Sequence, residues 1–219
     1  MKFRQSTALV AIVAISTLVL TSCGKPSQNY AIDTKDGVYF AVPNSWHLIT
    51  TKELAAEEAL STQAGAADRL ARVQWQIAYS GEAKVSAARV LNFQAPNSPI
   101  VYARVRALSA TEIQQVSYNY LRDLIVPLSG WEDGSATSIP VFVVKTDEEL
   151  VQKGARGVHA VFNFTNYGIS QTVNQIGLLS NDHRSLILFV IRCTTDCYTK
   201  NLPVIEKIVA SFTDKGPNR

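Results

Sequence analysis

The residues of this chain best suited to chemistry are its three cysteines, because a thiolate can act as a nucleophile, bind a metal or form a disulfide. Cys193 and Cys197 are separated by three residues, whereas a redox-active Cys-x-x-Cys pair has two. A metal site would need two further ligands, and His183 is the only nearby candidate. A disulfide is the favoured interpretation in an oxidising compartment, with free thiols and a metal or redox site as the alternatives.

The third cysteine, Cys23, follows a segment of the kind that directs export. Lys2 and Arg4 form a positive head, and residues 8–20 are a run of apolar and small residues. This run is shorter than the roughly 18 residues that a membrane-spanning helix needs. A positive head, a short apolar run and small residues before a cleavage point together predict a signal peptide at 1–22.

The tetrapeptide Leu20-Thr21-Ser22-Cys23 resembles the lipobox of bacterial lipoproteins. In that family the cysteine thiol takes a diacylglycerol, and the signal is cut just before the cysteine. The resemblance implies lipidation of Cys23, a polar tether over 23–36 and a location on the extracytoplasmic face of a cell membrane, in the periplasm or at the cell surface. An ordinary signal peptide with an unrelated cysteine is the alternative.

Other chemistry-bearing residues form no local catalytic motif. The chain has no Gly-x-Ser-x-Gly elbow, no His-Glu-x-x-His pair and no phosphate-binding glycine loop. His47 and His159 are predicted on a surface hairpin and on the polar face of a strand, and His183 in a turn. The pairs Glu57-Glu58 and Glu148-Glu149 are predicted on solvated faces. We therefore expect a protein that is not an enzyme and that has no cofactor or metal.

The charge of the chain argues against a nucleic-acid partner. Of its 219 residues, 21 are Lys or Arg and 18 are Asp or Glu. Cleavage before Cys23 would remove Lys2 and Arg4 and leave 197 residues with 19 basic and 18 acidic side chains. These charges are mixed along the chain, whereas a nucleic-acid-binding face needs clustered basic residues.

The elements that must position these residues begin after the tether. Residues 38–42 alternate as a half-buried strand, and 46–50 are predicted as its returning partner in a hairpin. Residues 52–60 favour a helix by composition. A strand is predicted over 100–108 with Tyr102, Arg104 and Arg106 on one face, and a polar connection over 147–154. Further strands are predicted over 87–94, 141–145, 155–164, 170–180 and 185–192. Short turns join the last three of these strands, which must therefore be antiparallel.

The segment 64–79 fits two interpretations. Leu70, Val73 and Ile77 repeat at helical spacing, yet the apolar positions from Val73 to Tyr79 also alternate as in a strand. We favour a helix because Ser80-Gly81 is a typical C-terminal stop. On that helix Trp75 and Tyr79 would form an aromatic pair on a second face, and this pair is the candidate partner-binding surface, with burial of both faces as the alternative.

Two more helices complete the predicted domain. Ser109 and Glu112 match a capping box that opens a helix ending near Pro127 and Gly130. Residues 201–212 are predicted as an amphipathic helix, followed by a frayed tail over 213–219. Residues 37–212 are thus predicted as a single α+β domain: a twisted antiparallel sheet covered by helices on both faces.

The segment from Val38 to Trp46, VYFAVPNSW, resembles the opening of the PsbP-like superfamily, and the close with Ala210-Ser211-Phe212 is similar to the ending of that family. Together with the lipobox, the chain most resembles LpqN-type lipoproteins of actinobacteria. The resemblance implies an α-β-α sandwich and a non-enzymatic assembly, scaffold or binding role. The basic arm of the photosystem protein and the acidic cluster expected for binding the GTPase Ran have no counterpart here, so neither function is carried over.

Three function classes follow from the sequence. The first is a membrane-anchored binding or scaffold protein for an envelope protein or lipid. The second is a carrier of an apolar, lipid-like ligand, which requires a cavity of a few hundred Å³ lined by aromatic residues. The third is an envelope hydrolase, which requires a buried acid or histidine paired inside a cleft.

Overall fold

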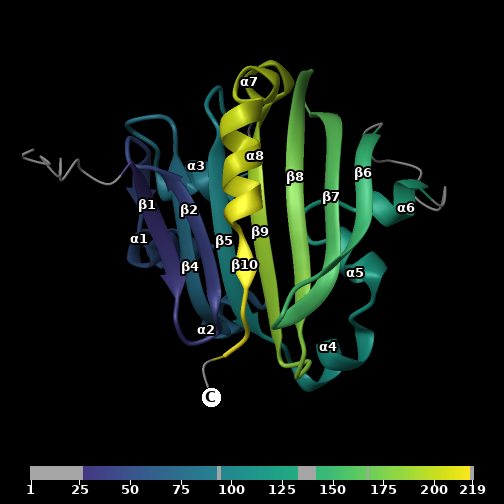
Figure 1. Ribbon diagram of the computed structural model, residues 1–219. Coiled ribbons are helices and arrows are strands. Elements are labelled where there is room, and N and C mark those ends of the chain that lie inside the picture. The colour runs from purple at the N-terminus through teal and green to yellow at the C-terminus, as the bar shows by residue number, and fades with distance from the viewer. Residues whose placement is uncertain (1–26, 93–94, 133–141, 167, 218–219) are drawn as a thin grey trace, which may run out of the picture.

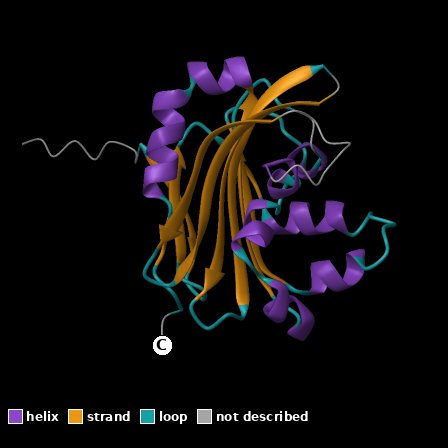
Figure 2. Ribbon diagram, turned by 90° about the vertical axis from the view of Figure 1, so that its right-hand side faces the viewer, coloured by secondary structure: helices purple, strands orange, loops and turns teal. Residues whose placement is uncertain are grey.

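The computed structural model describes residues 27–92, 95–132, 142–166 and 168–217. The predicted signal peptide and Cys23 lie outside these ranges. The described part of the chain contains two antiparallel sheets, and helices lie on both faces of the larger one (Figures 1 and 2). The α+β class with an antiparallel sheet between helices, expected from the sequence, is therefore confirmed.

The large sheet has seven strands in the order β3-β4-β5-β9-β8-β7-β6. Its strands are β3 (His47–Ile49), β4 (Val73–Ser80), β5 (Ile100–Ala107), β6 (Phe142–Val151), β7 (Ala155–Asn166), β8 (Ile169–Ser180) and β9 (Ser185–Thr194). Short turns join β6 to β9 into a meander, and the part from β7 to β9 was predicted. Strand β5 pairs with β9 across the middle of the sheet.

The small sheet has three strands in the order β1-β2-β10. They are β1 (Gln28–Asp33), β2 (Val38–Pro43) and β10 (Thr213–Asp214). This sheet and the C-terminal helix cover one face of the large sheet (Figure 1). Sequence analysis did not predict a second sheet, because β10 is only two residues long and joins β2 from the far end of the chain.

Eight helices are found in the described residues, and most are short. They are α1 (Thr51–Glu58), α2 (Ala66–Ala71), α3 (Ala87–Leu91), α4 (Ala110–Gln115), α5 (Tyr118–Arg122), α6 (Leu128–Glu132), α7 (Thr195–Lys200) and α8 (Leu202–Ser211). The first six lie on the face of the large sheet opposite α8 (Figure 2). The predicted capping box of Ser109 and Glu112 is confirmed at α4, and Thr50 and Glu53 form a second one at α1.

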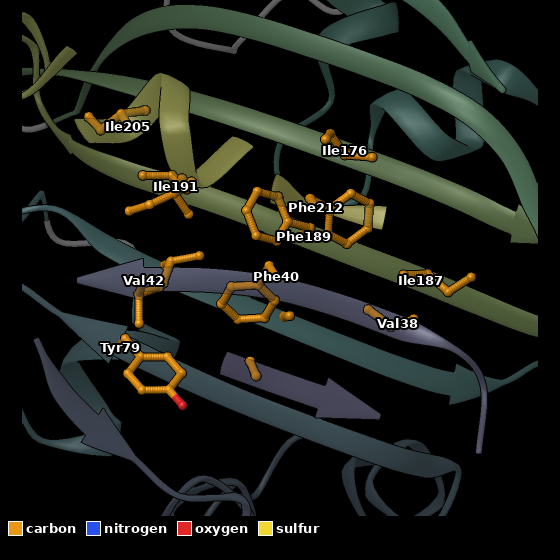
Figure 3. Packing of buried hydrophobic residues seen from close by; sticks show 14 of the residues in the cluster. Val38, Phe40, Val42, Tyr79, Ile176, Ile187, Phe189, Ile191, Ile205 and Phe212 are labelled. Carbon is orange, nitrogen blue, oxygen red and sulfur yellow. The ribbon is translucent and has the colours of Figure 1, made fainter. Parts of the chain in front are cut away.

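Each face of the large sheet has its own hydrophobic core. Between the two sheets and α8, Phe40 of β2 lies 5.3 Å from Phe189, and Phe189 lies 4.6 Å from Phe212, measured between ring centroids (Figure 3). Under the helices, a second core contains Leu54 of α1 and Phe162 of β7. The large sheet is therefore buried on both faces at its centre, so its central strands carry apolar residues at odd and even positions.

The helix predicted over 64–79 is wrong beyond residue 71. Residues 66–71 form α2, but Val73–Ser80 is β4, which pairs with β3 and β5. The alternating pattern prevailed because Tyr79 and the partly buried Trp75 and Ile77 face the core between the sheets.

The strand predicted over 87–94 is also wrong, since Ala87–Leu91 is the helix α3 and residues 93–94 lie outside the described ranges. The Ser86 hydroxyl accepts a hydrogen bond from the Arg89 backbone N–H and so caps this helix. The strand predicted over 46–50 is found as β3, but the predicted hairpin is wrong, because β3 pairs with β4 in the large sheet and not with β2.

The boundaries of the predicted domain also change. Strand β1 lies inside the segment predicted as a tether, where Ala31 and Asp33 are buried while the residues between and before them are exposed or half-buried. Strand β10 lies inside the predicted frayed tail, and Asp214 is buried. Residues 147–151, predicted as a connection, continue β6.

One predicted helix is broken in the structure and another is confirmed. The helix opened by Ser109 divides into α4 and α5 because Val116 takes an extended conformation and Ser117 caps a new helix. The helix predicted over 201–212 is found as α8, and the short helix α7 precedes it, with Asn201 between the two.

Candidate functional site

The candidate site is a cleft of about 870 Å³ on the helix-covered face of the large sheet. Strands β5 and β9 form its floor. One wall comes from α1, α2 and α3, and the other from α5 and the residues that follow it. The cleft exists because one group of short helices covers the strands on one side of β5 and β9 and a second group covers the strands on the other side. The middle of the sheet is left partly open.

The floor of the cleft is divided lengthwise into a polar row and an apolar row. Alternation along β5 directs Tyr102, Arg104 and Arg106 to the cleft, while the residues between them face the opposite core. Each has an apolar partner on β9, in the pairs Tyr102 with Val190, Arg104 with Leu188 and Arg106 with Leu186. The sequence predicted this polar face of β5 but gave no reason to place apolar residues of β9 beside it.

The polar row is connected to α1 by an ion pair. Arg104 Nη1 lies 2.7 Å from Glu58 Oε1, and Gln76 Nε2 donates a hydrogen bond to the other oxygen of Glu58. Tyr102 in turn donates a hydrogen bond to Gln76 Oε1 at 2.8 Å. The prediction that Glu57-Glu58 is a solvated face is wrong, because both residues are half-buried and Glu58 fixes the end of α1 to the sheet.

A second ion pair connects the polar row to α4 and α5. Arg106 Nη1 lies 2.8 Å from Glu112 Oε1, and Arg106 Nη2 donates a hydrogen bond to the Tyr120 hydroxyl at 2.8 Å. Partial burial raises the pKa of Glu112, but hydrogen bonds from Ser109 and the charge of Arg106 outweigh this effect and lower it below its usual value. Glu112 is therefore ionised near neutral pH and holds α4 at the edge of the site.

Arg192 closes one end of the floor. Its Nη2 donates hydrogen bonds to the carbonyls of Arg89, Val90 and Asn92, at 2.9, 3.0 and 2.6 Å, and so holds the C-terminal end of α3. Burial, with a contribution from the nearby charge of Arg89, lowers the pKa of Arg192 to about 10. The guanidinium is therefore still charged at neutral pH.

The apolar part of the cleft depends on how α5 rests on β8. A Cβ atom at Gly177 would lie 2.7 Å from the Leu121 carbonyl oxygen, so only glycine permits this approach. Gln175 lies two residues before Gly177, on the same face of β8. Its Nε2 donates hydrogen bonds to the carbonyls of Leu121 and Arg122. These contacts position Leu124 and Ile125 along the wall of the cleft.

The residues selected from the sequence lie elsewhere. Cys193 and Cys197 are joined by a disulfide that connects the end of β9 to α7. Tyr79 is only 4% exposed, and its ring lies 6.2 Å from Phe40; Trp75 is partly buried and 6.5 Å from the same ring. Figure 3 shows Tyr79 beside Val42 in the core between the sheets. The prediction that Trp75 and Tyr79 form an exposed docking pair is therefore wrong.

The three histidines are distributed over the surface and do not meet. His47 is exposed on β3, and His183 lies in the β8–β9 turn with a positive φ of 60°. On the face of β7 opposite the cleft, His159 Nδ1 lies 3.0 Å from Glu148 and its Nε2 lies 3.0 Å from Asn174 Oδ1. Among the described residues that line the cleft there is no histidine.

Two kinds of feature are absent from the described residues. Within the described ranges, no set of three or more His, Cys, Asp or Glu side chains is arranged to hold a metal ion. In the same part of the chain, no helix has both the length and the apolar character needed to cross a bilayer.

No protein-family model and no curated protein sequence matches the chain. Solved structures with a similar fold include the following three. LpqN of Mycobacterium tuberculosis, described as involved in cell envelope biogenesis, has a TM-score of 0.45 at 12% identity, covering 85% of this chain and 89% of LpqN. The cyanobacterial PsbP of Synechocystis has a TM-score of 0.46 at 13% identity, with 89% and 98% covered.

The third is the Ran-binding protein Mog1p of Saccharomyces cerevisiae, with a TM-score of 0.42 at 7% identity, covering 86% of this chain and 96% of Mog1p. The PsbP-like superfamily and the LpqN-type lipoproteins, named from sequence motifs, are thus both represented among the similar structures. Identities and scores this low describe a related arrangement of strands and helices and carry no function over to this chain.

Proposed function

We propose that the protein is an envelope lipoprotein, anchored to the extracytoplasmic face of a cell membrane through a lipid on Cys23, and that its domain binds an amphiphilic envelope component in the cleft without turnover. The observation that carries the binding part is the cleft itself, whose volume of about 870 Å³ lies within the roughly 300–1,000 Å³ of small-molecule sites. The anchor rests on the lipobox resemblance.

The division of the floor supports an amphiphile as the ligand. A molecule lying along β5 and β9 would place one edge against Tyr102, Arg104 and Arg106 and the other against Val190, Leu188 and Leu186. The arginines are already paired with Glu58 and Glu112, so the polar row is nearly neutral and offers hydrogen bonds more than net charge. A purely apolar ligand would leave this row without partners, which makes a wholly hydrophobic carrier the weaker candidate.

The chemistry of the lining supports binding without turnover. Two of the three carboxylates in the lining already have partners: Glu58 is paired with Arg104, and Asp123 accepts hydrogen bonds from the backbone N–H and the hydroxyl of Ser129. The third is Glu57, in a described lining that contains no histidine. A hydrolase would need an acid or base free to exchange a proton with the substrate. The alternative ligand is a protein partner that docks over the helices. The presence of the cleft favours a small amphiphile over such a partner.

A cleft-filling variant tests the proposal. Leu188 is half-buried on the floor, so Leu188→Trp should project an indole into the cleft and weaken binding of a dansyl-labelled fatty acid by at least about tenfold, equal to ~1.4 kcal/mol. Fluorescence titration measures the affinity, and thermal unfolding checks the fold.

The matched control is Val143→Trp, which makes the same kind of change at an exposed position of β6 outside the cleft. It should bind the probe as the wild type does. Equal affinity of Leu188→Trp and wild type, or an equal loss in Val143→Trp, would reject the cleft as the binding site.

A further inference from the structure

The outer face of the small sheet carries an apolar patch that the fold does not use. On β1, Ala31 and Asp33 point into the protein, whereas Tyr30 and Ile32 point outward and are 65% and 48% exposed. Ile32 is paired with Tyr39 of β2, which is half-buried. We call Tyr30, Ile32 and Tyr39 the outer patch.

Basic side chains accompany the outer patch. Lys215 Nζ lies 5.0 Å from the centroid of the Tyr39 ring, and Lys35 is exposed in the β1–β2 turn. The acids of the same region are withdrawn from the surface, since Asp33 and Asp214 are buried and Asp36 is half-buried. Tyrosine, an aliphatic side chain and lysines are the combination that suits the interface of an anionic bilayer, where rings lie at headgroup depth and ammonium groups meet phosphates.

The position of the patch in the chain points to the same occupant. Only residues 24–27 separate Cys23 from the first residue of β1, and a chain of that length reaches at most about 18 Å when fully extended. Tyr30 is the third residue of β1. If Cys23 carries a lipid, the start of β1 is held near the bilayer, and any rotation that lays the small sheet on the membrane brings the outer patch into contact with it.

We infer that the outer patch docks the domain flat on the surface of an anionic lipid bilayer; this inference rests on the proposed anchor at Cys23. The small sheet lies on one face of the large sheet (Figure 1). The cleft lies on the opposite face, among the helices. Docking through the outer patch therefore turns the cleft away from the bilayer, toward the aqueous side. The ligand of the cleft then arrives from that side, and the anchor fixes orientation as well as location.

Depth-dependent quenching tests the inference on the processed lipoprotein, extracted from cells that make the full chain and reconstituted in vesicles of phosphatidylethanolamine and phosphatidylglycerol. Tyr30→Trp and Ile32→Trp each add one reporter to Trp46, Trp75 and Trp131. In vesicles with brominated acyl chains, we expect most of the emission added at either position to be lost. The matched control is Ile113→Trp on α4, 39% exposed on the helix-covered face of the large sheet, whose added emission should be unchanged.

The mass of the N-terminal peptide, measured on the same sample, separates the two claims. A diacylglyceryl group on Cys23 with unquenched reporters at 30 and 32, or with equal quenching at 113, overturns the docking face and leaves the anchor standing. A Cys23 without an acyl chain overturns the anchor, and this inference with it.

Discussion

At the scale of single residues, the least ordinary group outside the cleft is the Asp36 carboxyl. It lies where the β1–β2 turn meets the C-terminal segment: the backbone N–H of Lys215 donates to the Gly37 carbonyl, and that of Gly216 donates to Asp214 Oδ1. Burial, together with the charge of Asp33 and a hydrogen bond with it, raises the pKa of Asp36 to about 6. Burial likewise raises the pKa of Asp214.

These pKa values predict how stability changes with pH. The folded protein holds the Asp36 proton up to about pH 6, whereas the unfolded chain releases it near the ordinary value of 3.8. A group whose pKa is raised on folding favours the folded state at low pH, so its contribution is lost as pH rises through this interval.

Asp36→Asn should therefore raise the free energy of unfolding at about pH 8, by on the order of 1 kcal/mol after allowance for solvent screening, and change it little at about pH 4. Urea unfolding at the two pH values measures the effect. The matched control, Asp68→Asn on the exposed face of α2, should show no such dependence. A variant that is no more stable than wild type at the higher pH would contradict the raised pKa of Asp36.

At the scale of elements, the disulfide between Cys193 and Cys197 fixes the passage from β9 to α7. Its loop is short, with a sequence separation of 4, so its effect on the unfolded chain is small. Replacing both cysteines with alanine should lower the free energy of unfolding by about 2 kcal/mol or less. Reduced wild-type protein is the matched control and should unfold at nearly the same denaturant concentration as the double variant.

The bond itself is checked by mass. The unreduced peptide that contains both cysteines should be lighter by two hydrogens than the reduced one. Two freely alkylated thiols at these positions in protein taken from the envelope would show that the bond does not form there.

Elements whose apolar residues repeat with a single clear period could be predicted from the sequence. Elements whose apolar residues fit both the helical and the strand period could not. Strand β5 and the meander β7–β9 were predicted closely because alternation or long apolar runs left no other choice. The residues of β4 fit both periods, and they form a strand because they pair with β3 and β5, which are distant in sequence. Strand β1 was missed for a related reason: Ala31 and Asp33 are its inward residues, and neither is a strong core signal.

The candidate site could be predicted only in part. The row of Tyr102, Arg104 and Arg106 was visible as one face of β5. Its partners Glu58 and Glu112 were assigned to a solvated face and a capping box, because nothing local shows that α1 and α4 return to the same strand. The aromatic pair Trp75 and Tyr79 attracted attention as a docking surface, yet in a strand the same residues face the core.

At the scale of the whole molecule, the two faces of the large sheet have different tasks. One face is sealed by the small sheet and α8 around Phe40, Phe189 and Phe212. The other is covered by short helices that leave the cleft between them. We assign stability and membrane docking to the first face and ligand binding to the second, where two ion pairs connect helices to the cleft floor.

The most direct test of this account is native mass spectrometry of the protein extracted from its own envelope under non-denaturing conditions, with wild type and Leu188→Trp compared. We expect the wild type to retain an intact amphiphile and the variant to be free of it, with the same modification at Cys23 in both. A wild-type protein without bound mass, a variant that retains the same molecule, or the release of cleaved products in place of an intact ligand would contradict binding without turnover in the cleft.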